Sequence, residues 1–192
     1  MITDIYYVIP EIFLSLSLMF LLILGVFNKK GSIIVYNLSL LILIISIPLI
    51  LNVPSDGEIL IFNESYKVDY LSNFIKILIV ISTLFVLLTS SQYLKSTKIF
   101  NIEYPILILS SILGMMVMVS SNDLIVFYIG LELQSLALYV LASFNRDNIL
   151  SSESGLKYFV LSALSSGLLL YGCSLVYGFS SSTNFLQISF NY

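Results

Sequence analysis

Six long apolar stretches alternate with short polar breaks along the chain. Each stretch is continuously apolar rather than alternating residue by residue, which is typical of transmembrane helices and not of barrel strands. At 1.5 Å per residue, about 20 helical residues cross a hydrocarbon core of about 30 Å. The pattern predicts an all-α, polytopic transmembrane helix bundle of about six helices. The expected spans are Tyr6–Phe27, Ser32–Val53, Leu71–Leu94, Tyr104–Val119, Leu124–Phe144 and Gly155–Tyr177.

The polar breaks carry signals of their own. The fourth span is the shortest, so it must recruit residues near Asn122 or lie in a locally thin bilayer. Residues 28–31 predict a tight turn, and the alternating stretch Glu58–Phe62 predicts a small hairpin with Tyr66–Val68. The segment Asn184–Tyr192 is expected to be an outer loop.

Composition supports a lipid environment and excludes several kinds of site. Hydrophobic residues make up 58% of the 192 positions and charged residues 10%, against about 25% charged in soluble domains. The chain has one cysteine, Cys173, and no histidine, so we expect no disulfide framework, no metal site and no haem. The basic residues are scattered, which does not indicate nucleic-acid binding.

Loop charges predict the orientation. The even-numbered loops hold one basic residue, Lys67, beside five acids, whereas the odd-numbered loops are basic. The positive-inside rule places the odd-numbered loops inside and both termini outside. The basic residues of the odd-numbered loops are Lys29, Lys30, Lys95, Lys98 and Arg146.

Besides Glu11, in the first turn of the first span, three charged side chains fall within the spans. Lys76 lies about 9 Å deep by the helical rise, so we expect it to snorkel to the interface. Lys157 lies near the inner end of the sixth span, and either an interface anchor or a functional group fits that position. Glu132 lies near the bilayer centre and is too short to snorkel.

An ionised carboxylate at mid-membrane costs about 2.5–3.5 kcal/mol on insertion scales. Glu132 must therefore face a cation or water, or hold a proton, and a proton relay needs such a group. The alternative is a neutral carboxyl group that only hydrogen-bonds helices together. Tyr128, Glu132, Ser135 and Tyr139 form one polar stripe at i, i+4, i+7 and i+11, which is expected to face protein or water. Small residues at 162–167 and Gly114 predict close helix packing instead.

Two stretches carry a resemblance to a known family. GLELQSLALYVLASFNRDN (Gly130–Asn148) and ESGLKYFVLSALSSGLLLYGCSLVYGFSSSTNF (Glu153–Phe185) resemble subunit 2 of NADH:ubiquinone oxidoreductase, respiratory complex I, in its mitochondrially encoded form. The similarity is strongest from about Asn122 to Phe185, and PEIFL (Pro10–Leu14) is similar too.

The resemblance implies a proton-translocating subunit with an antiporter-like fourteen-helix fold, in which three helices precede inverted five-helix repeats. Residues 1–100 would hold those three helices, and residues 101–192 the first three helices of an incomplete repeat. Glu132 and Lys157 match family residues of the proton path, which makes Lys157 a functional candidate, with Tyr128, Ser135 and Tyr139 as supporting residues.

The family's broken seventh helix and second repeat have no counterpart here, which suggests a truncated product or, the reading we favour, a split subunit whose remainder is a separate chain. The resemblance further implies neighbouring subunits 4 and 4L, membrane lipids, and the mitochondrial inner membrane with both termini on the intermembrane-space side. Flavin, iron–sulfur clusters and ubiquinone are expected elsewhere in the complex, with no cofactor, metal or redox centre in this chain. A cation/proton antiporter subunit and a structural helix scaffold remain as alternatives.

Overall fold

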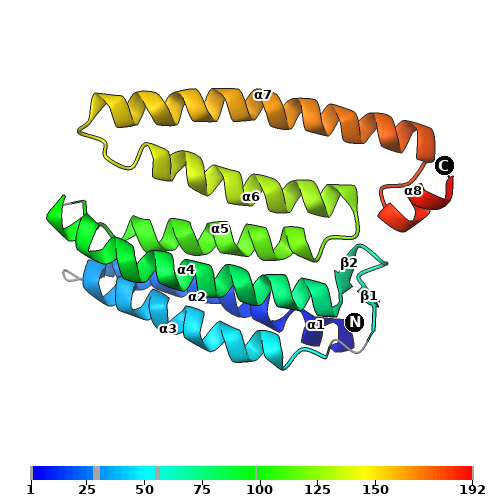
Figure 1. Cartoon of the computed structure of the whole chain (residues 1–192), viewed down its shortest axis with the longest axis horizontal. Helices are drawn as coiled ribbons and strands as arrows, with labels where there is room; N and C mark the ends of the chain where they lie inside the picture. The colour runs from blue at the N-terminus through cyan, green and yellow to red at the C-terminus, as the bar shows by residue number, and fades with distance from the viewer. Residues whose placement is uncertain (1, 28–30, 55–56, 98, 192) are drawn as a thin grey trace.

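The computed structural model describes residues 2–27, 31–54, 57–97 and 99–191. Six long helices run back and forth through it, which confirms the predicted helical bundle (Figure 1). Five of them are long and apolar enough to cross a membrane, and α5, with 17 residues, is shorter. The long helices are α2 (Ile9–Phe27), α3 (Gly31–Leu51), α4 (Tyr70–Ser96), α5 (Glu103–Val119), α6 (Leu124–Ala142) and α7 (Ile149–Ser180).

The clearest differences from the predicted segments are in the first span, at the start of α7 and in the terminal segment. The first span is divided into α1 (Ile2–Tyr7) and α2. Helix α7 begins earlier than predicted because the Asn148 side chain accepts a hydrogen bond from the Leu150 N–H and caps it. The predicted terminal loop contains a short helix, α8 (Phe185–Asn191).

The predicted hairpin is confirmed. Strands β1 (Ile59–Ile61) and β2 (Tyr66–Val68) pair antiparallel. The backbone N–H of Lys67 donates to the Ser120 carbonyl at 2.7 Å, so the hairpin is tied to the end of α5. Both ends of the chain lie at this same end of the bundle (Figure 1). The predicted turn at residues 28–31 and three of the loop lysines, Lys29, Lys30 and Lys98, fall largely outside the described residues, and the membrane orientation stays a prediction.

The hydrophobic core lies among α2, α3, α4 and α5. Leu14, Leu43, Leu87 and Leu109 are fully buried there, one from each of the four helices. Helix α6 covers α5, and α7 covers α6, so the last two helices extend the bundle in one direction (Figure 1). The core continues across residue 100, and the division of the chain at that residue stays a prediction.

Two glycines set the contact between α5 and α6. A Cβ atom on Gly114 would lie 2.7 Å from the Gly130 carbonyl oxygen and 2.6 Å from the Gln134 backbone nitrogen. A Cβ on Gly130 would lie 2.8 Å from the Met118 backbone nitrogen. Since only glycine lets the two backbones approach so closely, the packing role predicted for Gly114 is confirmed.

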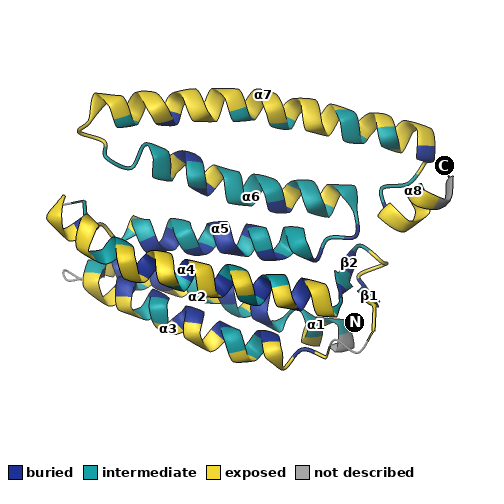
Figure 2. Ribbon diagram, in the orientation of Figure 1, coloured by how far each residue is buried: buried dark blue, intermediate teal, exposed yellow. Residues whose placement is uncertain are grey.

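Helix α7 is the least covered helix. Within α7 only Gly155 and Ser180 are buried, and most of its surface is exposed (Figure 2). A Cβ atom on Gly167 would meet nothing within 4 Å, so the small residues there make no close packing within the described chain. The uncovered faces of α7 are left to lipid or to further protein.

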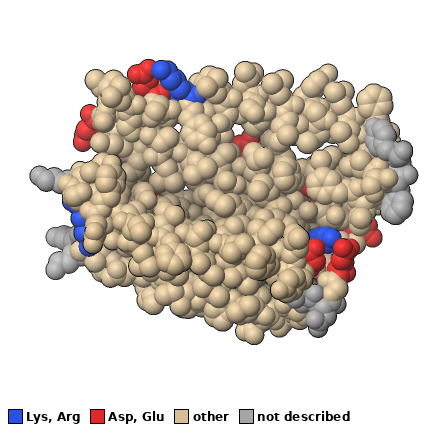
Figure 3. Space-filling view, in the orientation of Figure 1, with Lys and Arg blue, Asp and Glu red and all other residues tan. Residues whose placement is uncertain are grey.

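Charged side chains gather at the two ends of the bundle, and the band between them is almost uncharged (Figure 3). This is the distribution expected of a protein whose middle lies in hydrocarbon, where unpaired charge is costly. A few acidic atoms show inside the band, some of them in a hollow of this face (Figure 3).

Candidate functional site

The polar stripe of α6 faces α7. Tyr139 is buried, and its ring packs edge-to-face on Tyr158 and Phe159 of α7, with ring centroids 4.9 and 5.7 Å apart. Residues four and seven positions apart share a helix face, so the rest of the stripe points the same way. At Tyr139 the prediction that the stripe faces protein is confirmed.

Glu132 occupies the middle of this stripe and is half-buried. Its Oε1 is buried and has no hydrogen-bond partner among the described residues. The Ser135 hydroxyl donates to the backbone carbonyl of Glu132 at 3.1 Å and not to the carboxyl group. A buried acceptor without a partner costs free energy, which is relieved when a proton, a water molecule or a cation reaches it.

Lys157 pairs with an acid of its own helix and not with Glu132. Its Nζ lies 2.6 Å from Oε1 of Glu153 on its own helix, and the lysine side chain is 68% exposed. The contact of Tyr139 with Tyr158 puts Lys157 near the level of Tyr139 and about 10 Å from Glu132 along the helix axis. Gly155, two positions before, packs on Ser143 at the end of α6, so Lys157 points away from α6.

The prediction that Lys76 snorkels to the interface is wrong. Its side chain is 2% exposed, and its Nζ lies 2.7 Å from Oε1 of Glu11, which is also buried. The hairpin residues Tyr66 and Val68 are buried over this end of the bundle, and an acid on the adjacent part of α2 neutralises the ammonium group. The sequence could have indicated this pair. Glu11 and Lys76 carry opposite charges and lie at similar distances from the N-terminal ends of the first and third predicted spans.

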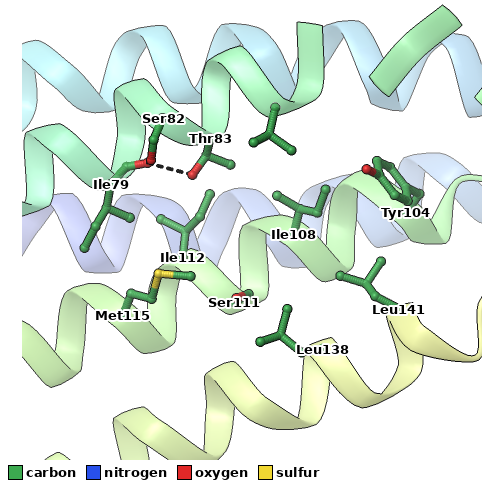
Figure 4. A pocket seen from close by; sticks show the side chains of 11 residues that line it. Ile79, Ser82, Thr83, Tyr104, Ile108, Ser111, Ile112, Met115, Leu138 and Leu141 are labelled. Atoms are coloured by element: carbon green, nitrogen blue, oxygen red, sulfur yellow. Dashed lines mark hydrogen bonds between the residues drawn. The ribbon is translucent and has the colours of Figure 1, made fainter. Parts of the chain in front are cut away.

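An apolar groove with a volume of about 430 Å³ is lined by residues of α4, α5 and α6 (Figure 4). The polar side chains that line it are Ser82, Thr83, Tyr104 and Ser111, and the Thr83 hydroxyl already donates to the Ile79 carbonyl. Glu132 and Lys157 do not line the groove. No group of three or more His, Cys, Asp or Glu side chains in the described ranges could hold a metal ion. The groove therefore offers a surface for apolar groups rather than a site for proton or metal chemistry.

Residues 121–192 match the family model described as "NADH:quinone oxidoreductase/Mrp antiporter, TM". The homologues of the chain are NADH-quinone oxidoreductase subunit N proteins. The protein of Pelagibacter ubique is 70% identical over 93% of the chain, and that of Maricaulis maris is 50% identical over 97%. The chain spans only 38% and 39% of the length of these relatives.

Two solved structures share the fold. Respiratory complex I from Thermus thermophilus with bound aureothin contains a chain that superposes with a TM-score of 0.76 at 26% identity, over 91% of this chain and 38% of that one. A chain of an archaeal membrane-bound sulfane sulfur reductase superposes with a TM-score of 0.75 at 18% identity, over 97% of this chain and 40% of that one, which is a likeness of fold alone. The bundle is thus antiporter-like, as the sequence predicted.

Proposed function

Starting from these homologues, we propose that this chain is the N-terminal part of a proton-translocating membrane-arm subunit of NADH-quinone oxidoreductase, of the subunit N type. It moves protons while quinone is reduced elsewhere in the complex. The observation that carries the proposal is the Glu132 carboxyl group, which sits in the middle of a spanning helix with Oε1 buried and unpartnered.

Such a group is suited to bind and release a proton. In apolar surroundings the protonated form is favoured because it carries no charge, whereas an arriving water or cation favours the carboxylate. Tyr128, Ser135 and Tyr139 bring hydroxyl groups to the same face of α6 and support the path. Glu132 therefore changes protonation when its contacts change.

Lys157 takes a later position on the same path in this proposal. Because it lies on the side of α7 away from α6, it meets a helix outside the described chain rather than Glu132 itself. The exposed surface of α7 supports this arrangement, since a spanning helix with a lysine on its outer side is stabilised by protein cover. Neighbouring membrane-arm subunits, or the rest of the same subunit, supply that cover.

The proposal extends to the partners, which are the remainder of the subunit as a separate chain, and subunits 4 and 4L as neighbours. For the location, the resemblance suggested a mitochondrial inner membrane. The relatives named above are bacterial, which favours the energy-converting membrane of a bacterium for this chain. Flavin, iron–sulfur clusters and the quinone site are assigned to other subunits.

The test is the Glu132→Gln variant in the assembled complex, measured in sealed vesicles oxidising NADH. Glutamine keeps the size of the side chain but cannot release a proton, so we expect assembly with a lower ratio of protons pumped to electrons transferred. The matched control is Glu103→Gln, which removes an exposed acid at the start of α5 that pairs with Arg146. We expect this variant to keep the normal ratio. A normal ratio in Glu132→Gln contradicts the proposed role.

A cation/proton antiporter subunit is the second candidate, because the matching family model names both systems. Co-purification with NADH-oxidising subunits separates the two, since an antiporter assembly contains none. A scaffold without a proton path of its own predicts that Glu132→Gln has no effect on pumping.

A further inference from the structure

A second ionisable cluster lies at the hairpin end of the bundle, and we name Glu11, Tyr66 and Lys76 the outer cluster. Its three residues come from α2, β2 and α4. The Tyr66 hydroxyl donates to Oε1 of Glu11 at 2.8 Å, and Nζ of Lys76 donates to the Tyr66 oxygen at 3.1 Å. The same Nζ lies 2.7 Å from Oε1 of Glu11. One carboxyl oxygen thus receives both the ammonium group and the phenol.

The hairpin seals the outer cluster from the end of the bundle. Tyr66 packs in a small core with Val53, Ile61 and Val68, and Val8 of the α1–α2 junction lies against it. Glu11 is 4% exposed and Lys76 is 2% exposed. A charge pair this deep is stabilised fully only when its remaining lone pairs and protons are also hydrogen-bonded.

The outer cluster does not meet that condition. Oε2 of Glu11 is buried and has no hydrogen-bond partner among the described residues. The Ser120 hydroxyl, which belongs to the segment bonded to β2, is likewise buried without one. An ionised carboxylate with one oxygen that accepts no hydrogen bond is poorly stabilised, whereas a protonated carboxyl group needs fewer hydrogen-bond donors around it. Oε2 of Glu11 is therefore the atom of the outer cluster that is left to take a proton or a water molecule.

Tyr66 is placed to connect the two ionisable groups. Burial raises the pKa of its phenol well above the ordinary value, the Glu11 carboxylate raises it further, and the nearby Ser120 side chain opposes the rise. The phenol therefore keeps its proton over the whole physiological range. It donates to one partner while it accepts from the other, which is the arrangement required for a concerted proton shift.

We propose that Glu11 is a second proton-binding site of this chain, which exchanges a proton with Lys76 through Tyr66. In the exchange an N–H bond of Lys76 breaks as its proton passes to the Tyr66 oxygen, and the phenolic proton passes to Oε1 of Glu11. The ion pair becomes a neutral amine and a neutral acid, and Tyr66 is unchanged. Among the described residues, Lys76 and Tyr66 are the ionisable groups bonded to Glu11, and Lys67 pairs with Glu58 and Asp69 outside the cluster.

This inference rests on the proposed function and assigns a further site to it. The N-cap of α6, Asp123, lies at the same end of the bundle, and Glu132 is nine residues along the helix, or about 13 Å deeper. The outer cluster would then serve the exchange of protons with the side of the membrane that the hairpin faces.

The experiment is infrared difference spectroscopy of the assembled complex during NADH oxidation. The carbonyl band of a protonated carboxylic acid is expected to change during turnover in the wild type, and this component is lost in Glu11→Gln. It is retained in Glu132→Gln, which removes a different acid. Unchanged difference bands in Glu11→Gln overturn the inference.

Two further variants separate proton exchange from a structural role. Glu11→Asp keeps the acid and is expected to shift the carbonyl band of the protonated acid. An unshifted band contradicts the inference. This variant also provides the test if Glu11→Gln fails to assemble. Glu11→Gln/Lys76→Met removes both charges, and a purely structural pair predicts that it pumps at the wild-type ratio, whereas we expect a lower ratio. The two failures can be told apart. A normal ratio of protons to electrons in Glu132→Gln contradicts the proposed function, whereas the inference about Glu11 is tested independently of this ratio by the infrared band.

Discussion

Nζ of Lys76 lies 2.7 Å from Oε1 of Glu11, and both side chains are almost completely buried between α4 and α2. The pair joins the first spanning helix of the described chain to the third, and Tyr66 joins both to the hairpin. Removal of one partner leaves an unpaired charge in an apolar site, which costs more than the loss of the contact itself.

We therefore expect Lys76→Met to lower the free energy of unfolding by about 3–5 kcal/mol. Glu11→Gln/Lys76→Met is expected to recover much of this loss, because no charge is left buried alone. Chemical unfolding in detergent micelles measures both. A double variant as unstable as Lys76→Met would show that the cost comes from packing and not from charge.

The α5–α6 contact gives a matched pair of glycine substitutions. Gly114→Ala places a methyl group 2.6 Å from a backbone nitrogen of α6, which must move, so we expect a loss of about 1–3 kcal/mol in stability. Gly167→Ala meets nothing within 4 Å and replaces a poor helix former by a good one. We expect it to be neutral or stabilising by up to about 1 kcal/mol, and thermal unfolding of the two variants compares them directly.

Asp69 gives α4 a pH-sensitive N-cap. Burial raises the pKa of its carboxyl group, but hydrogen bonds from Ser72 and Lys67 together outweigh this effect and bring the pKa below the ordinary value. The cap therefore contributes its full stability above the ordinary aspartate pKa of 3.8, and loses it as pH falls through the lower folded pKa.

We expect Asp69→Ala to cost about 1 kcal/mol at neutral pH. Asp69→Asn is the control, because asparagine can cap a helix but does not titrate. We expect the free energy of unfolding of Asp69→Asn to fall less at acid pH than that of the wild type, because the titration of Asp69 is absent. An Asp69→Asn protein with the acid dependence of the wild type would contradict this account.

The hairpin turn holds three successive non-glycine residues at positive φ, Phe62, Asn63 and Glu64. The Glu64 carbonyl accepts hydrogen bonds from the side-chain amides of Asn122 at 2.8 Å and Asn184 at 3.0 Å, which hold the strained turn in place. Each left-handed non-glycine residue costs about 1–2 kcal/mol.

Glu64→Gly removes part of this strain while the accepting carbonyl is kept, so we expect a gain of about 0.5–1 kcal/mol after the entropy of the unfolded glycine is counted. Asn122→Ala is expected to destabilise the protein, because it removes a donor to the same carbonyl. Thermal unfolding in detergent tests both, and a destabilised Glu64→Gly variant would show that the glutamate side chain itself supports the turn.

The sequence by itself determined the six helices, the hairpin, the apolar band and the face of α6 that carries Glu132. These features depend on local periodicity and on the cost of polar groups in lipid, and both can be read along the chain. The same reasoning identified Glu132 as an unusual carboxyl group, but it could not say which side chains face it.

The partners of the ionisable groups were decided only by the tertiary structure. Lys76 is paired with Glu11 and covered by Tyr66, because α2, α4 and the hairpin meet at one end of the bundle. Lys157 is turned away from Glu132 because Gly155 fixes the rotation of α7 against α6. The reach of a charged side chain depends on helix rotation and on what covers its route to water, and neither is encoded in the depth of a residue within its own helix.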